Sequence, residues 1–178
     1  MNDPPSGLAD RAQQLRRAFD RSFAAPAHFD ATPKEDLLAI RSGSQVLALR
    51  LAEIGGLFAD KKITRIPGRV ATLLGIAGFR GAILPVYDLG MLLGQAKGKA
   101  SRWLVIAASA PIAFAFEGFD GHLRISKDAI FPQEAGERAI YVRDCARIEG
   151  VVRPILNLPS VLDAIRAQSA QPAPREER

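Results

Sequence analysis

The chain has few of the residues from which catalytic and metal sites are usually built. Its 178 residues include one cysteine and two histidines. A disulfide or a CxxC metal pair needs two cysteines, so Cys145 alone supports neither and fits a reducing compartment. No histidine partner for Cys145 is visible in the sequence, so we interpret it as a plain thiol. His28 and His122 have no metal partner or nucleophile at a recognisable spacing, and we expect both to be solvated.

Long apolar runs and charge clusters of one sign are also missing. No stretch reaches the roughly 18 uncharged apolar residues of a membrane span. The N-terminus carries arginines and acids where a signal peptide would have its apolar core, so a cytoplasmic location is expected. The net charge is +5, but the basic residues are scattered and interleaved with acids. This pattern argues against a nucleic-acid partner.

Nucleotide-binding and catalytic motifs are incomplete. The segment LGQAKGKAS lacks the first glycine and the final hydroxyl of a phosphate-binding loop, at Leu93 and Ala100. GIAGFRG, from Gly75, is GxxGxxG and not the GxGxxG of a dinucleotide site. Glu117 and Asp120 are interpreted as a turn cap and a solvated charge. We therefore expect a protein that is not an enzyme and binds no cofactor or metal.

An internal repeat is the main organising feature. LLAIRSGSQVLALRL, from Leu37, resembles WLVIAASAPIAFAFE, from Trp103, and GAILPVYDLGMLL, from Gly81, resembles GVVRPILNLPSVL, from Gly150. The two pairs of blocks have the same order and nearly the same spacing. The repeat predicts two structurally similar halves, about 35–96 and 102–165.

Local signals within each half indicate short strands. Ser-Gly-Ser between two apolar runs indicates a hairpin, and Pro85 is expected at a sheet edge or strand end. Asp88 is expected to cap a short helical turn. The predicted fold is mainly β, with two small five-stranded, SH3-like barrels packed together. The predicted strands are 38–40, 46–51, 63–66, 82–86, 103–106, 112–116, 140–142 and 151–156, followed by a helix over 159–167.

The two ends are predicted to lie outside this core domain, 35–168. Residues 8–24 have helical apolar spacing and predict an amphipathic helix, which with its linker fills 1–34. Such a helix can cover the core or dock a separate partner. The tail 169–178 is expected to be disordered.

Residues 36–165 resemble the CheW family of chemotaxis coupling proteins. The segment that carries the resemblance is ITRIPGRVATLLGIAGFRGAILPVYDLGMLLG, from Ile63 to Gly94, with support from AEIGG, FAFEG and VVRPILNLPSVL. The resemblance implies two packed five-stranded barrels without catalysis. It also implies a scaffold that joins a CheA-type histidine kinase to the cytoplasmic tip of chemoreceptors.

The resemblance also implies where partners bind. Glu53, Gly75 and Arg80 match positions associated with receptor binding, and Phe79 and Gly81 flank the arginine. The apolar surface of the first barrel is implied to serve the kinase, without specific contact residues. Arg80 offers a planar fork of donors beside an apolar wall, and the glycines would let a partner helix approach.

Several alternatives remain open from the sequence. Arg80 can instead form an internal ion pair with Glu53 or Asp88. The same adaptor can serve a signalling pathway unrelated to motility. A basic small barrel can also bind RNA, although most phenylalanines lie in apolar runs and are not arranged for base stacking.

Overall fold

The chain divides into two compact units, Met1–Thr32 and Pro33–Arg178. The computed structural model describes residues 11, 13–17, 32–67, 70–96, 98, 100–133 and 140–170. In the first unit Arg11 and residues 13–17 are helical, and Leu15 is 69% exposed. The rest of the helix expected over 8–24, its linker and the tail beyond Ala170 lie outside the described residues.

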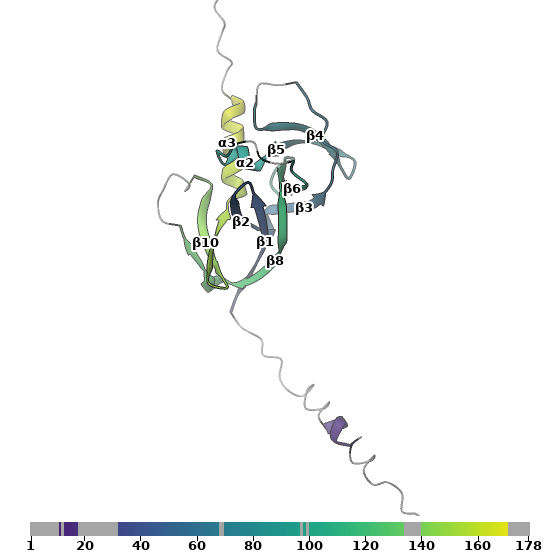
Figure 1. Ribbon diagram of the computed structural model, residues 1–178, viewed down its shortest axis with the longest axis vertical. Helices are drawn as coiled ribbons and strands as arrows, with labels where there is room; N and C mark the ends of the chain where they lie inside the picture. Colours follow the sequence, from purple (N-terminus) through teal and green to yellow (C-terminus); the bar gives the residue numbers. More distant parts are fainter. Residues whose placement is uncertain are drawn as a thin grey trace, which may run out of the picture. The chain divides into compact units, whose positions relative to one another are not determined.

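The second unit is mainly β, as the sequence predicts, with strands in two sheets and short helices beside them (Figure 1). The strands are β1 (Lys34–Ser42), β2 (Gln45–Arg50), β3 (Ile54–Ala59), β4 (Leu73–Phe79), β5 (Ala82–Asp88), β6 (Trp103–Ala107), β7 (Ala113–Phe116), β8 (Gly118–Ser126), β9 (Ile130–Pro132), β10 (Val142–Ile148) and β11 (Val151–Leu156). The helices are η1 (Leu51–Glu53), α2 (Leu89–Leu92), η2 (Lys127–Ala129) and α3 (Leu158–Ala170).

The internal repeat is visible in the strand order of the two sheets. The six-stranded sheet has the order β8-β1-β2-β11-β10-β9, and the five-stranded sheet has the order β3-β6-β7-β5-β4. Each sheet contains a hairpin, β1–β2 or β6–β7, whose second strand runs parallel to a strand from the other half of the sequence. Ala48 pairs with Ile155 in the six-stranded sheet, and Ala113 pairs with Val86 in the five-stranded sheet. The two sheets are therefore built on one plan.

The two predicted halves, 35–96 and 102–165, do not each form one sheet. β1 and β2 pair with β8 and β11 from the second half, whereas β3 and β5 pair with β6 and β7. A lone hairpin leaves two unpaired edges, and exchange of strands between the halves covers them. One sheet has six strands where five were expected. Closure of each sheet into a barrel stays a prediction.

The two prolines of the repeat occupy equivalent positions. Pro85 pairs with Ile76 on one side, and the parallel ladder on the other side of β5 begins one residue later, at Val86. Pro154 likewise precedes Ile155, where the ladder with β2 begins. Proline has no N–H to donate, so each proline lies where its strand has a ladder on one side only.

Three apolar clusters form the core. The largest lies between the sheets and includes one face of α3, formed by Leu158, Val161, Leu162 and Ile165 at helical spacing. The other two belong to one sheet each, one around Phe79 and Leu84 and the other around Leu37 and Ile155.

The short helices begin at equivalent capping residues. Asp88 accepts a hydrogen bond from Met91 N (3.0 Å), as its expected capping role requires, and Asn157 accepts one from Ser160 N (2.9 Å). The predicted helix over 159–167 is present and extends to Ala170. Its last two residues thus belong to a helix and not to the expected tail.

Some strands differ from those predicted. Of the strand expected over 63–66, only one bridge forms, between Thr64 and Ile76. The strand expected over 140–142 begins at Val142 and continues to Ile148. β3, β4 and β8 were not predicted, because their glycines weaken the strand signal. Asp120 and His122 consequently lie in β8 and not in a turn or loop.

Candidate functional site

The candidate site is centred on the tight turn between β4 and β5. Phe79 pairs with Ala82, so Arg80 and Gly81 are the two central residues of a two-residue hairpin loop. Their φ angles are 47° and 87°, as a type I′ turn requires. Both residues are exposed. The fold therefore presents the predicted arginine at the tip of a hairpin.

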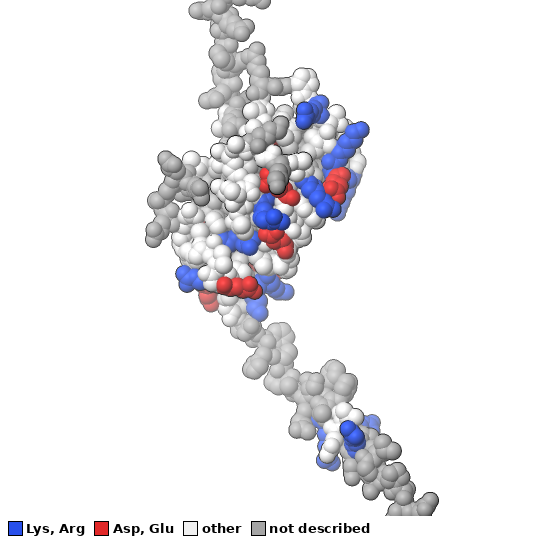
Figure 2. Space-filling model, in the orientation of Figure 1, with Lys and Arg blue, Asp and Glu red and all other residues white. Residues whose placement is uncertain are grey.

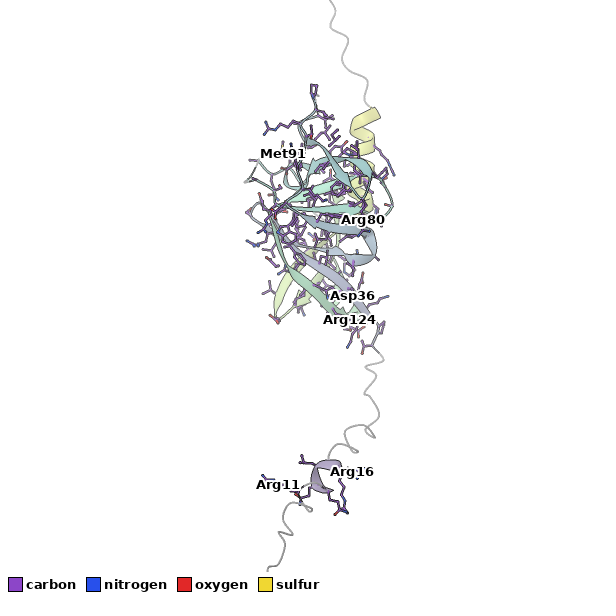
Figure 3. The ribbon with its side chains drawn as sticks, turned by 90° about the vertical axis from the view of Figure 1, so that its right-hand side faces the viewer. Arg11, Arg16, Asp36, Arg80, Met91 and Arg124 are labelled. Carbon is purple, nitrogen blue, oxygen red and sulfur yellow. The ribbon has the colours of Figure 1, made fainter. Side chains whose placement is uncertain are left out.

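Arg80 lies against an aromatic side chain from a neighbouring segment. Its guanidinium is 5.8 Å from the centre of the Phe58 ring in β3, and Lys61 Nζ is 5.5 Å from the same ring. Phe58 packs edge-on against Phe79, with ring centres 5.1 Å apart. Two cations thus lie over one aromatic ring, and the same ring packs against the buried Phe79. Figure 3 shows Arg80 well separated from Asp36 and Arg124.

The internal ion pair considered for Arg80 does not form in the described part of the chain. Asp88 caps α2, and Glu53 is bonded to α3. Among the residues that the structure describes, no ion pair involves Arg80 or Lys61. The tip and the adjoining Lys61 therefore carry two positive charges without a carboxylate partner in the described part of the chain.

Glu53 holds two parts of the core together. It lies in η1, and its Oε2 accepts a hydrogen bond from Leu158 N (2.9 Å), at the start of α3. Burial raises the pKa of the Glu53 carboxyl group, against the opposing effects of the Leu158 hydrogen bond and Arg50. Glu53 precedes β3, whereas Phe58, which touches Arg80, is near the other end of that strand. At a rise of about 3.3 Å per residue, the intervening strand separates Glu53 from the hairpin tip.

Gly75 and Phe79 are buried rather than available to a partner. Phe79 is 2% exposed and belongs to the core cluster of the five-stranded sheet. Gly75 has a φ of 144°, and a Cβ at this position would collide with the backbone of Thr64. The close approach expected at Gly75 is thus made by this chain itself. Of the predicted site residues, only Arg80 and Gly81 are exposed.

Phe58 and Lys61 were missed in the sequence. Nothing in their spacing relates them to Arg80, because β3 and β4 lie at opposite edges of one sheet and only the fold brings Phe58 and Phe79 together. The apolar run containing Phe58 was the only usable signal, and two glycines before it obscured the strand.

The remaining polar clusters serve the fold. Arg50 lies between Glu35 (2.7 Å) and Asp144 (2.5 Å), and Arg41 pairs with Asp120 (2.8 Å). Burial raises the pKa of the Cys145 thiol, which keeps it in the unreactive protonated form. In the part of the chain that the structure describes, no three metal-binding side chains come together.

The other surface features are an exposed histidine–aspartate pair and charges of mixed sign. His122 lies 2.9 Å from Asp36 on an exposed strand. Figure 2 shows basic and acidic groups side by side on the face in view. Among the described segments, no helix combines the length and apolar character needed to cross a membrane.

Comparison with known proteins places this geometry in a family. Residues 36–166 match the family model of the CheW-like domain. Protein PilI from Pseudomonas aeruginosa is 29% identical over 87 residues, which cover 49% of this chain and 47% of PilI, so the match spans about half of that relative. The crystal structure of the scaffolding protein TtCheW from Thermoanaerobacter tengcongensis has the same fold, with a TM-score of 0.64 and 19% identity over 70% of this chain and 90% of that one. The family match covers the strands of both sheets and most of α3, and on this basis the chain belongs to the CheW-like domain family.

Proposed function

We propose that this protein is a non-catalytic adaptor that couples chemoreceptors to a CheA-type histidine kinase. The single observation that carries the proposal is the exposed hairpin tip, where Arg80 lies over Phe58 with no carboxylate partner among the described residues. An arginine oriented by an aromatic ring has donors free for a partner's carboxylate. Membership of the CheW-like family supports the choice of partners.

Reversal of the charge at Arg80 tests this function. In the proposed interface, the change Arg80→Glu removes an anchor worth about 2 kcal/mol or more, which weakens receptor binding about 30-fold or further. Stability should change little, because an exposed cation–π contact contributes only about 0.5–1 kcal/mol. The measurements are affinity for soluble chemoreceptor-tip fragments from the same genome, and melting temperature.

The matched control is Arg124→Glu, which makes the same charge change on exposed β8, away from the hairpin tip (Figure 3). It should leave receptor affinity unchanged. Equal losses of receptor affinity in both variants would show that the effect comes from net charge and not from the position of Arg80. Wild-type affinity of Arg80→Glu would remove Arg80 from the interface, and its unfolding would assign the arginine to the fold.

A second candidate is an adaptor of the same kind in a pathway that does not control motility. The partial match to Protein PilI, a relative that is not named for chemotaxis, is the observation that favours it. Capture with the full chain as bait, followed by identification of the bound kinase, separates the two. A kinase encoded with flagellar genes supports chemotaxis, whereas a kinase from another gene cluster supports the second candidate.

A further inference from the structure

Gly78, two residues before Arg80, is a glycine that the isolated fold does not require. It lies in β4 without a left-handed φ angle, and a Cβ built on it would meet no atom within 4 Å. Gly75 in the same strand is different, because a side chain there would collide with Thr64. Glycine weakens a strand, so its presence at an exposed position without local need suggests a close approach from outside.

The residue paired with Gly78 is Ile83, in β5. Directly paired residues lie on the same face of a sheet. Ile83 is 71% exposed, whereas Leu84, on the opposite face, is buried in the core cluster. The outer face of the hairpin therefore consists of a large apolar side chain next to a bare stretch of backbone.

The free edge of β4 already pairs at one point with another segment of the chain. The pairing residue is Thr64, whose N–H donates to Ile76 O (2.8 Å) and whose carbonyl accepts from Ile76 N (2.9 Å). A partner that contacts both Ile83 and Gly78 packs across the face of the hairpin and not along this edge. An α-helix suits such a face, because one ridge of its side chains can lie against Ile83 while its backbone approaches Gly78.

The charges at the tip indicate the chemistry of that helix. Arg80 and Lys61 both lie over Phe58, and neither has an ion-pair partner among the described residues. A helix that crosses the hairpin with a carboxylate directed at the tip would complement them.

We propose that Gly78 is the point of close approach for an acidic partner helix that packs on Ile83, and that it thereby determines which partners fit. The inference rests on the proposed receptor-coupling function, since the chemoreceptor tip is the partner in question. It adds a residue outside the predicted site and a reason why that residue has no side chain.

The decisive variant is Gly78→Val, in which stability and binding should move in opposite directions. Valine favours an exposed strand, so the melting temperature should rise by about 2–4 °C. The two added methyl groups should hold the partner helix away and weaken binding of the chemoreceptor-tip fragment about tenfold or more. Gly78→Ala, with a single methyl group, should show a smaller loss of affinity in the same direction.

The matched control is Gly55→Ala in β3, another exposed glycine without a left-handed φ angle, where a Cβ would make only ordinary contacts of 3.5 Å or longer. It should leave affinity unchanged. Wild-type affinity of Gly78→Val would overturn the inference, as would a lower melting temperature, which would show that the face is covered within the protein. If the unchanged protein binds no receptor fragment, the proposed function itself fails.

Discussion

At the residue scale, Glu53 shows how a partner-binding position implied by resemblance can have a structural role. Its carboxylate is half-buried and accepts the Leu158 N–H at the start of α3. Burial raises its pKa, so the folded protein holds the proton more strongly than the unfolded chain does. The buried charge therefore reduces stability as the pH rises from the ordinary glutamate range through the raised folded-state pKa.

Glu53→Gln should remove this pH dependence. Glutamine keeps an oxygen acceptor for Leu158 N–H without the buried charge, so the variant should be as stable as the wild type or more stable at pH 7. The difference in free energy of unfolding should shrink as the pH falls through the raised folded-state pKa of Glu53 to the ordinary glutamate range, because the folded protein then carries no charge on Glu53. Urea unfolding of both proteins across this range is the measurement.

Glu53→Ala provides the contrast, because it leaves the Leu158 N–H without this acceptor and should cost about 1 kcal/mol. If Glu53→Gln were much less stable than the wild type at pH 7, the Glu53 charge would be net favourable and the direction of its pKa shift would be wrong. If Glu53→Gln lost receptor binding without a change in stability, Glu53 would be assigned to the receptor interface.

At the element scale, the repeat places two tight turns of the same type at equivalent positions. Arg80-Gly81 joins β4 to β5, and Glu149-Gly150 joins β10 to β11, with φ angles of 49° and 81° in the second turn. Arginine and glutamate are both unfavourable at the first central position, where a type I′ turn prefers asparagine. At Arg80 this conformational cost falls on the residue that is proposed to bind the receptor.

The equivalence of the turns provides a matched pair of variants. Arg80→Asn and Glu149→Asn should each stabilise the protein by up to about 1 kcal/mol, because asparagine adopts the left-handed conformation more easily. Arg80→Asn should lose receptor binding, whereas Glu149→Asn should keep it. Melting temperature and affinity for the receptor fragment test both, and retention of binding by Arg80→Asn would contradict the proposed role of the guanidinium.

At the scale of the whole molecule, the exchange of strands makes the two sequence halves interdependent. The β1–β2 hairpin lies between β8 and β11 of the other half, and β6–β7 lies between β3 and β5. Each half alone would leave the edges of its hairpin unpaired and its apolar faces uncovered.

Fragments 33–96 and 102–170 should therefore be unfolded or aggregated when expressed separately. When they are expressed together they should form a folded complex, because the contacts between the halves include whole strand ladders. Circular dichroism and size-exclusion chromatography of each fragment and of the pair are the measurements. An independently folded half would show that each half can close its own sheet.

Much of the local structure was determined by the sequence itself. The Ser42-Gly43-Ser44 turn, the Asp88 cap and the apolar spacing of α3 all depend on neighbouring residues, and the structure has each of them. The repeat also predicted two equivalent parts, because similarity between two segments is visible in the sequence without knowledge of where they lie in the fold. The glycine-rich strands β3, β4 and β8 were missed, because their pairing comes from partners distant in sequence and not from strand propensity.

Only the tertiary structure decided which predicted site residues reach the surface. Gly75, Phe79, Arg80 and Gly81 are close in sequence, yet the strand buries the first two and the turn exposes the last two. Side chains alternate between the faces of a sheet, and which face is covered depends on strands contributed by the other half of the chain. For the same reason the sequence identified Arg80 as an anchor, but only the fold joined it to Phe58 and Lys61 and left Gly78 and Ile83 open beside it.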